Sequence, residues 1–458
     1  MKLDLYGSLY RRTWQLRAGQ FGREIFRRAD EMSRRERLTA NALKDFQLEQ
    51  TQALLIHAYQ QVPFHRARME AVGFDPFKLT DLTQLERLPF MTKEELRAEG
   101  LHLVAQSYDP KSLLENASGG STGMPVKFYQ DQAYTIFNRA NKLRQRRWFG
   151  YQMGDKIAYL WGARRDTRIK GFRHYLRQTL RREHWIDAFD LTSRHMLEFK
   201  NLLDTWQPEL LVAYPSALQA FAAYLQNQGL AVRSPGAIEC SAEKLQAAQR
   251  VVIEQVFNCP IYDVYGSREF GVIAAECEQH NGLHIFADAF YLEVIKDGHP
   301  AQPGELGEIV ITCFGNFAMP FIRYTTGDLG VMATEPCACG RVLPRLAEVV
   351  GRTNGVISTP DGKLVHGAFF SKFFYDLPQV KRYRVHQIDR ANLDILVESN
   401  GHFSPDQAAA LANQIQTKLG ESIKVSCRLV SNIEPLPSGK LAYLVSDVPL
   451  TFIQKELG

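Results

Sequence analysis

The sequence predicts a two-domain α/β protein, with a large N-terminal unit over residues 1–352 and a small, mobile α+β unit over residues 353–458. Three observations support this. Between residues 156 and 266, short apolar runs alternate with helix-length segments, and each run ends in small or polar residues. From about residue 284, strand patterns separated by Asp-Gly and Pro-Gly turns indicate a mostly antiparallel β-rich section. Past Gly351, a second set of strands surrounds one helix, and 458 residues suffice for two cores.

The composition excludes several classes of protein. Hydrophobic residues make up 45% and charged residues 23% of the chain, which is ordinary for a globular protein. The net charge of +5 is small and no RRM, KH or zinc-finger pattern accompanies it, so we expect no nucleic-acid partner. No run of about 18 apolar residues predicts a transmembrane segment and no secretion signal opens the chain, so we expect a cytoplasmic protein. The seven cysteines then favour free thiols or metal ligands over disulfides.

The first 60 residues predict a basic helical extension. Apolar positions from residue 7 to about 60 follow helical spacing, and arginines interleave with them. The arginine-rich face is either solvated or lies on a membrane surface, and we favour the solvated face. Pro63 disfavours helix in the residue before it, so we expect the helix to end there. Farther on, Thr92 and Glu95 predict a capping box with a structural role.

A glycine-rich stretch at residues 117–128 predicts a phosphate-binding loop. Three glycines let the backbone approach a ligand closely, hydroxyls and amides offer donors, and a lysine adds positive charge. The stretch is not a Walker A loop, because no Gly-Lys-Ser/Thr follows the glycines. The alternative is a Ser/Gly linker or a tight hairpin turn. The candidate residues are Ser118, Gly119, Gly120, Ser121, Thr122, Gly123 and Lys127.

The α/β section places further candidates at strand ends, because ligands in such domains bind beyond the carboxyl ends of the strands. Trp161 and Tyr214 stand at two of these ends, as part of an aromatic pocket or as plain core. The basic residues between Arg144 and Arg182 either grip an anion, such as a coenzyme A phosphate, or form a solvated helix face. The expected elements are a helix at 133–147 and strands at 156–161, 209–216, 238–243 and 260–266.

Four later motifs carry chemistry that suits a nucleotide. Tyr265 can stack on a base, and Glu269 beside it offers the oxygen ligands that Mg²⁺ prefers. Asp328 follows a strand and can accept hydrogen bonds from both hydroxyls of a ribose. Arg352 adds a cation at the expected domain boundary, and Lys440 lies on a proline-containing loop near the C-terminus. The motifs are Asp263–Glu269, Arg323–Asp328, Gly351–Asn354 and Pro435–Lys440.

In this order and spacing, the glycine-rich loop and the four motifs resemble those of the adenylate-forming superfamily, which includes acyl-CoA synthetases, peptide-synthetase adenylation domains and luciferase. Within the superfamily, the chain resembles the phenylacetate–CoA ligase branch and its CapK-like members. The resemblance extends from about residue 50 onward. The segments that carry the narrower resemblance are Val62–Phe64, Leu88–Lys93, Ser241–Glu243 and Tyr265–Glu269.

The resemblance assigns a role to each motif. The glycine-rich loop would cradle the ATP phosphates, Glu269 would bind Mg²⁺, and Asp328 and Arg352 would hold the ribose. Lys440 would bridge the substrate carboxylate and the α-phosphate, and it would act as a catalytic residue together with Glu269. The residues that would line or shape the adenine pocket are Ser241, Ala242, Glu243, Tyr265, Gly266 and Ser267.

The function that the resemblance implies is ATP-dependent activation of a carboxylic acid to acyl-AMP, with pyrophosphate release, followed by acyl transfer to coenzyme A. One alternative is transfer to an amine or hydroxyl in polysaccharide or secondary-metabolite biosynthesis, and another is a non-catalytic nucleotide-binding scaffold. The acid stays open, and a homodimer is compatible with the sequence. Two positions depart from the family pattern: Arg268 stands where many relatives have a small hydroxyl residue, and Asn354 replaces an aspartate often found at the hinge.

A cluster of thiols predicts a structural zinc site. Cys277, Cys337, Cys339 and one histidine would complete a tetrahedral Cys₃His set. We favour His284, which opens a strand and follows a Gly-Leu pair that CapK-like relatives share, and His280 is the alternative. A second alternative is that the cysteines are buried without a metal. A zinc ion with four protein ligands would be structural and would hold the region of Asp328 in place.

Overall fold

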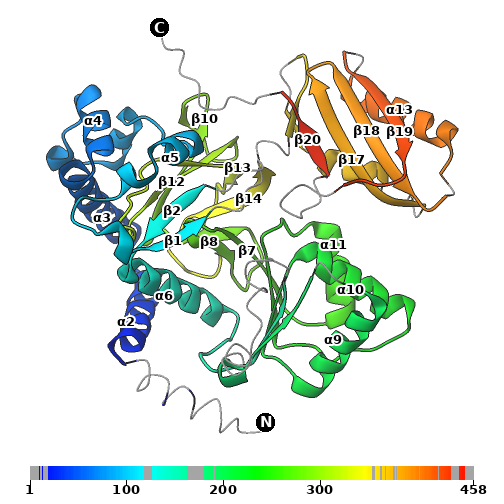
Figure 1. The fold of residues 1–458 in the computed structure, drawn as a ribbon, viewed down its shortest axis with the longest axis horizontal. Helices are drawn as coiled ribbons and strands as arrows, with labels where there is room; N and C mark the ends of the chain where they lie inside the picture. Colours follow the sequence, from blue (N-terminus) through cyan, green and yellow to red (C-terminus); the bar gives the residue numbers. More distant parts are fainter. Residues whose placement is uncertain are drawn as a thin grey trace.

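The structure is a computed structural model that describes residues 10, 13, 19–117, 126–161, 179–188, 191–352, 356–361, 364–366, 368–374, 377, 379–401, 403–420, 422–434 and 443–448. Within these residues, the strands form a 12-stranded sheet, a four-stranded sheet and two two-stranded sheets. The four-stranded sheet lies to one side of the large sheet with helices of its own (Figure 1). No described helix combines the length and the apolar character needed to cross a bilayer.

The predicted N-terminal helix is divided into separate helices. The helical prediction is confirmed for residues 19–35 and 40–61, and the segment is interrupted between them because the Thr39 hydroxyl accepts a hydrogen bond from the Ala42 amide at 3.2 Å and caps a new helix. The expected stop before Pro63 is confirmed, and this proline also opens the next helix, where its missing N–H is not needed. The α-helices are α2 (Gly19–Arg35), α3 (Ala40–Gln61), α4 (Pro63–Ala71) and α5 (Lys93–Glu99), and the 3₁₀-helices are η1 (Pro76–Lys78), η2 (Leu82–Arg87), η3 (Gly100–Leu103) and η4 (Pro110–Ser112).

The predicted α/β section forms the parallel half of the large sheet. Its strands run in the order β4, β3, β5, β6, β7, and every neighbouring pair is parallel. The strands are β3 (Ile157–Leu160), β4 (Glu183–Ile186), β5 (Leu210–Ala213), β6 (Ala237–Ser241) and β7 (Ile261–Ser267). The helices of this half are α6 (Gln132–Trp148), α9 (Ser193–Trp206), α10 (Pro215–Asn227) and α11 (Ala247–Phe257).

The predicted antiparallel section continues the same sheet instead of forming a separate one. β7 pairs with β8 in the antiparallel sense, and the order continues through β9, β14, β13, β12, β10 and β11. The strands are β8 (Gly271–Glu276), β9 (Leu283–Ile285), β10 (Phe290–Lys296), β11 (His299–Pro300), β12 (Leu306–Cys313), β13 (Tyr324–Met332) and β14 (Arg345–Arg352). A separate hairpin, β1 (Leu114–Ala117) with β2 (Lys127–Gln130), flanks the glycine-rich loop.

The C-terminal unit has the predicted α+β composition. Its sheet runs in the order β19, β18, β17, β20, and α13 packs on it through Leu411 and Ile415, which lie in one buried cluster with Val385 and Ile395. The elements are β15 (Val356–Ser358), β16 (Leu364–His366), α12 (Ala368–Phe374), β17 (Val380–Asp389), β18 (Asn392–Ser399), α13 (Pro405–Leu419), β19 (Lys424–Val430) and β20 (Leu444–Ser446).

The core of the large unit consists of separate buried clusters. One cluster joins the parallel strands to α9, α10 and α11 and includes Leu211, Phe221 and Ile253. A larger cluster joins the antiparallel strands to α2 and α6, where Phe128 and Phe321 are fully buried. The sheet is therefore covered by apolar contacts at both halves, which holds its strand ends in fixed positions.

Two arginines of the predicted basic region are buried. Arg144 Nη1 donates to Asp288 Oδ1 at 2.7 Å, and its Nε lies 3.6 Å from Glu36. Arg146 Nε donates to Glu239 Oε2 at 2.9 Å. A solvated face and an anion site were both wrong for these two residues, because α6 packs against α2 on one side and β8 on the other. Residues 162–178, which hold many of the other basic residues, lie outside the described part of the chain.

A second buried ion pair joins the Leu-Pro-Phe segment to the large sheet. Arg323 donates from Nε and Nη2 to the two oxygens of Glu293 at 3.1 and 2.9 Å, and Nη1 donates to the Leu88 carbonyl at 2.5 Å. Both side chains are almost fully buried. The guanidinium also lies over the Phe90 ring at 4.3 Å from its centroid. Arg323 therefore fixes the start of β13 and the path of residues 88–93 together.

We expect Arg323→Met to destabilise the protein by about 3–5 kcal/mol, because Glu293 would remain buried without its partner. Urea unfolding followed by tryptophan fluorescence measures the loss of unfolding free energy. The matched control is Arg194→Met, which removes an exposed helical pair with Glu198 and should change stability by about 0.5 kcal/mol or less. Equal unfolding midpoints for the two variants would contradict the prediction that Arg323 contributes more to stability than Arg194.

Candidate active site

The predicted adenine-binding residues lie at the carboxyl end of the parallel strands. The Ser241 hydroxyl donates to the Val264 carbonyl at 2.9 Å, which ties the end of β6 to β7. Ala242 adopts a φ of 69°, a left-handed conformation that a residue with a Cβ seldom takes. The Glu243 carboxylate accepts a hydrogen bond from the Ser216 amide at 3.1 Å, at the start of α10. The loop after β6 is therefore held on both sides, which gives a base a fixed surface.

Tyr265 and Asp328, which are 63 residues apart, meet at this edge. The Tyr265 hydroxyl donates to Asp328 Oδ2 at 2.9 Å. Tyr265 comes from β7 and Asp328 from β13, so the contact joins the parallel and antiparallel halves of the sheet. One carboxylate oxygen is thus fixed by the phenol, and the two predicted nucleotide-binding side chains lie side by side.

A bulge in β13 places Asp328. Glu308 of β12 is opposite Leu329, and Val310 is opposite Thr325, so three residues of β13 face one residue of β12. The middle residue, Gly327, has a φ of +73°, which favours glycine. Bulges of this kind redirect a side chain and are frequent next to active sites. On its other side, Asp328 is the Cα partner of Arg352 in β14, so the two predicted ribose residues are neighbours.

Lys93 is a candidate that the sequence analysis missed. Residue 91 exchanges backbone hydrogen bonds with residues 323 and 325, each at 2.9 Å, so the segment from 88 to 93 runs beside β13. Lys93 then donates from Nζ to the Thr326 carbonyl at 2.7 Å, next to Asp328. A signal was available, since a lysine at the first position of a helix stands at the end where the helix dipole disfavours a cation. The predicted capping box of Thr92 and Glu95 is present and fixes this helix start.

The turn between β7 and β8 holds the predicted Mg²⁺ residue. Glu269 is buried, and its backbone carbonyl accepts a hydrogen bond from the Tyr134 hydroxyl at 2.8 Å. Gly266 is required here, because a Cβ would lie 2.3 Å from the Gly271 carbonyl oxygen. The Ser267 hydroxyl accepts from the Phe270 amide at 3.3 Å and tightens the turn. Arg268 is exposed in this turn.

Several predicted residues lie outside the described part of the chain. They are Ser118, Gly119, Gly120, Ser121, Thr122, Gly123, Asn354 and Lys440. Lys127, at the end of the glycine-rich loop, is described and pairs with Glu115 across the β1–β2 hairpin at 3.1 Å. Desolvation and the Glu243 carboxylate raise the pKa of Tyr443, three residues after Lys440. Tyr443 therefore lies near the loop after β6.

Two aromatic side chains follow strands of the same edge. The Trp161 and Tyr214 rings lie 4.1 Å apart at their centroids, with an interplanar angle of 32°. Tyr214 is buried and Trp161 is half-buried, so the pair is one wall of packed aromatic surface at the ends of β3 and β5.

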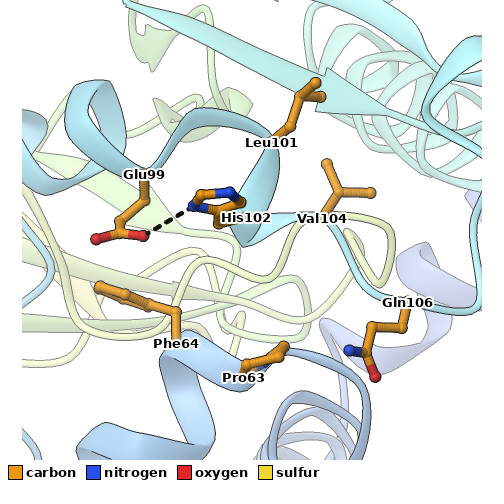
Figure 2. Close-up of a pocket in the computed structure, with 7 residues that line it drawn as sticks. All are labelled: Pro63, Phe64, Glu99, Leu101, His102, Val104 and Gln106. Atoms are coloured by element: carbon orange, nitrogen blue, oxygen red, sulfur yellow. Dashed lines mark ion pairs between the residues drawn. The ribbon is translucent and has the colours of Figure 1, made fainter.

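A surface cavity of about 400 Å³ lies elsewhere, between α4 and the turn after α5 (Figure 2). The His102 ring lies 3.6 Å from the Glu99 carboxylate, and both side chains are solvent-accessible. None of the predicted nucleotide or metal residues lines this cavity. Its lining residues are Pro63, Phe64, Glu99, Leu101, His102, Val104 and Gln106.

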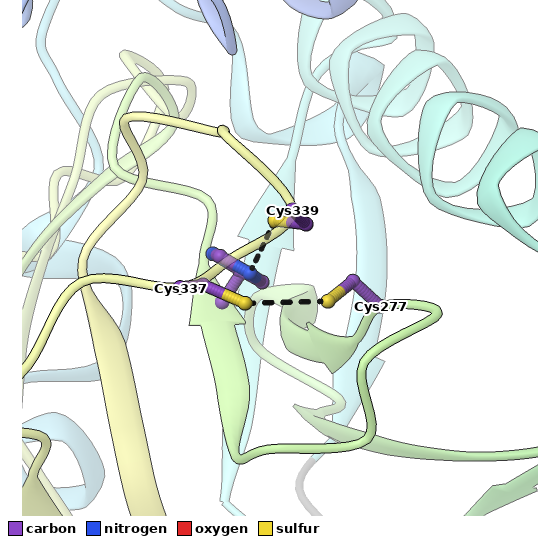
Figure 3. A group of neighbouring side chains, drawn as sticks. Cys277, Cys337 and Cys339 are labelled. Carbon is purple, nitrogen blue, oxygen red and sulfur yellow. Dashed lines mark hydrogen bonds between the residues drawn. The ribbon is translucent and has the colours of Figure 1, made fainter.

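The predicted metal ligands form one compact group. One potential ligand atom from each of Cys277, His284, Cys337 and Cys339 lies within 4.8 Å of all the others. The Sγ atoms of Cys277 and Cys337 are 3.7 Å apart, and Cys339 Sγ is 3.3 Å from His284 Nε2 (Figure 3). His284 Nδ1 lies 3.0 Å from the Leu343 carbonyl, which fixes the proton on Nδ1 and leaves the Nε2 lone pair facing the thiols. Three sulfurs and one imidazole nitrogen are a donor set that suits Zn²⁺.

The surroundings of the group determine the protonation states of these ligands. Burial lowers the pKa of His284 to about 4, so the imidazole is neutral near pH 7. Burial raises the pKa of Cys277 to about 12 in the metal-free chain, so binding of a cation there would release its proton. His280 stands apart from the group, with its Nδ1 3.3 Å from Glu276 and its ring against Tyr262.

Comparisons with known proteins find relatives that match most of the chain. Residues 357–447 match the family model of the CapK C-terminal domain. The phenylacetate–coenzyme A ligase of Pseudomonas putida is 28% identical over 421 residues, which cover 85% of this chain and 91% of that protein. The Thermus thermophilus enzyme of the same name is 28% identical over 336 residues, covering 70% and 73%. Protein CapK of Staphylococcus aureus is 23% identical over 388 residues, covering 81% and 82%.

The fold matches that of a solved acyl-CoA ligase. A 2-hydroxyisobutyryl-CoA ligase crystallised with an acyl adenylate superposes with a TM-score of 0.69 at 20% identity, covering 90% of this chain and 91% of that one. Within this class, the sequence relatives are phenylacetate–coenzyme A ligases and CapK, so the resemblance that the motifs indicated is confirmed.

Proposed function

We propose that this protein is an AMP-forming ligase that activates a carboxylic acid to acyl-AMP, releases pyrophosphate and transfers the acyl group to coenzyme A. The observation that carries the proposal is the meeting of Tyr265 and Asp328 at the strand edge, with the turn that holds Glu269 on the same β7–β8 hairpin. Relatives named as coenzyme A ligases along most of their length support the same reaction. The presence of Lys440 and Glu269 together with Asp328 in the sequence counts against a non-catalytic nucleotide-binding scaffold.

In the first step, the carboxylate attacks the α-phosphorus of ATP, and the P–O bond to pyrophosphate breaks. The adenine would lie between Tyr265 and the loop of Ser241 to Glu243, and Asp328 with Arg352 would hold the ribose. The glycine-rich loop and Lys127 would hold the phosphates, and Lys127 would exchange its exposed partner Glu115 for them. Negative charge grows on the oxygens around phosphorus, and the Lys440 ammonium would stabilise it in a closed site. Mg²⁺ held by Glu269 would neutralise further phosphate charge.

The second step requires the catalytic lysine to leave. We place the domain boundary after Arg352, where β14 ends, with residues 1–352 as the nucleotide-binding unit and 353–458 as the unit that carries Lys440. Rotation about this boundary would withdraw Lys440 and admit a thiol to the acyl carbon. The thiolate would then displace AMP. One cleft could serve both half-reactions in this way.

A zinc ion at Cys277, His284, Cys337 and Cys339 would be structural, because four protein ligands leave no position for a substrate. The ligands come from the end of β8, from β9 and from the loop before β14. The ion would therefore fasten β8 and β9 to the loop that joins β13 and β14, the strands that carry Asp328 and Arg352.

The test is pyrophosphate release by purified protein with ATP, Mg²⁺ and a panel of carboxylic acids, each with and without coenzyme A. The panel includes aryl and arylacetic acids because of the aromatic wall of Trp161 and Tyr214. We expect release with at least one acid and a thioester product only when coenzyme A is present. Release without a thioester would move the acceptor to an amine or hydroxyl. Absence of both release and ATP binding would overturn the proposal.

A further inference from the structure

A buried carboxylic acid, Glu308, lies behind Asp328 and has no part in the steps above. Glu308 is on β12, and only 7% of its surface is exposed. It stands opposite Leu329, the residue directly after the bulge in β13 that carries Asp328. A buried carboxyl is unusual enough to need an explanation from its partners.

The partners of Glu308 are parts of the bulge itself. Its carboxyl accepts a hydrogen bond from the Gly327 amide. The neighbouring residue of β12, Ile309, accepts from the Thr326 hydroxyl at 2.9 Å, and that hydroxyl in turn accepts from the Asp328 amide at 3.1 Å. β12 thus holds all three bulge residues through Glu308 and Ile309, so the position of Asp328 depends on this short stretch.

Two charged groups face Glu308 within the described residues. Lys93 comes from α5 and also donates to the Thr326 carbonyl, and Asp328 comes from β13. On the other side of β12, β10 presents Ile295, which is apolar, and its next residue Lys296 is paired with Glu305 at 2.7 Å. The pKa of Glu308 is raised to about 7: burial is the main cause, the Gly327 amide and Lys93 oppose the rise, and Asp328 adds to it. The group therefore changes charge near neutral pH.

We propose that Glu308 is a positioning residue for nucleotide binding: it holds in place the bulge that carries Asp328, and its charge sets how tightly the site binds ATP. The inference rests on the proposed function, because it places the ribose at Asp328. It goes beyond that function by adding a residue that does not touch the nucleotide and by giving the site a dependence on pH.

The direction of the pH dependence follows from the charges. Asp328 must be ionised to accept both ribose hydroxyls, and Lys93 adds a positive charge beside it. When Glu308 is protonated, it carries no negative charge to offset the ammonium of Lys93. The net charge of the site is then one unit more positive than when Glu308 is ionised. When Glu308 ionises, this positive potential is cancelled, and an anionic nucleotide binds less tightly. ATP affinity should therefore fall as the pH rises through about 7, the pKa of Glu308.

The experiment is calorimetric titration of ATP in excess Mg²⁺ from about pH 6 to 8.5, with wild type, Glu308→Gln and Glu305→Gln. Glutamine keeps the size and the acceptor oxygen but cannot ionise. The ratio of the wild-type Kd to the Glu308→Gln Kd should rise from near one at low pH to about threefold to tenfold at high pH. Glu305 lies just before β12 and its side chain is 41% exposed, so its variant should follow wild type. Titration of ATP, and of Asp263 with its pKa near 7, is common to all three proteins and cancels in the ratio.

A second variant keeps the test decisive if Glu308→Gln does not fold. Lys93→Met removes a cation that favours ionised Glu308, so the midpoint of the pH dependence should move upward. A constant Kd ratio for Glu308→Gln, or an unmoved midpoint for Lys93→Met, would overturn the inference while leaving ATP binding intact. If wild type binds no ATP at any pH, the proposed function fails first and the inference fails with it.

Discussion

Replacing Lys440 with alanine is expected to lower acyl-adenylate formation by about 10²- to 10³-fold, since removal of one preorganised charge from a closed site costs about that much. The fall should be in the rate of pyrophosphate release with the acid found by panel screening. Thioester formation from chemically prepared acyl-AMP and coenzyme A should continue, because the lysine is withdrawn in that step. Separate assays of the two half-reactions measure this difference.

The matched control is Lys424→Ala, which removes an exposed lysine of β19 in the same C-terminal unit. It should leave both half-reactions unchanged. Equal loss of both half-reactions in Lys440→Ala would mean that the lysine serves the fold of the unit and not the adenylation step. Unchanged adenylation would remove Lys440 from the proposed mechanism.

Loss of the metal group should have the largest effect on stability. Cys339→Ser removes one of the four ligands and should abolish binding of a stoichiometric zinc ion. Structural zinc contributes folding free energy directly, so we expect a fall of several kcal/mol, or roughly 5–10 °C in Tm for a unit of this size. Metal content by plasma mass spectrometry and thermal unfolding with and without a chelator measure both effects.

The control for this prediction is Cys427→Ser, because Cys427 lies on β19 and is half-buried away from the group. It should keep the metal and change Tm little. If the wild-type protein, purified without chelators, contained no zinc and the chelator left its Tm unchanged, the metal assignment would be wrong. The thiols would then be a reduced, metal-free cluster.

The fold class and most elements could be predicted because they depend on local patterns. Periodicity and turn residues indicated β3, β5 and β6, and they indicated a helix among the strands of the C-terminal unit. The union of the parallel and antiparallel strands into one sheet was not predicted. Strand order depends on which edges meet in three dimensions, and no local pattern encodes that the antiparallel β8 pairs with β7.

The site residues also divide into those that a local pattern reveals and those whose role depends on contacts distant in the sequence. Tyr265 and Asp328 were found from their motifs, but their hydrogen bond depends on a bulge that no residue pattern marks clearly. Arg144 and Arg146 were misread because charge patterning assumes an exposed helix, whereas their partners Asp288 and Glu239 are far away in the sequence. Lys93 was missed because its partner, the Thr326 carbonyl, is a backbone atom that the sequence does not reveal.

The pairing of β14 with two other strands determines where this chain can accept inserted residues. The strand pairs with β9 at His284 through Arg345 and with β13 at Asp328 through Arg352. Extra residues at the exposed positions 334–336, before the metal ligands Cys337 and Cys339, would enlarge a loop at small entropic cost. One extra residue inside β14 would instead shift its register and exchange the two faces of the strand beyond that point. We therefore expect insertions to be accepted before this strand, whereas a single inserted residue within it would separate Arg352 from Asp328 and uncouple the metal group from the hinge.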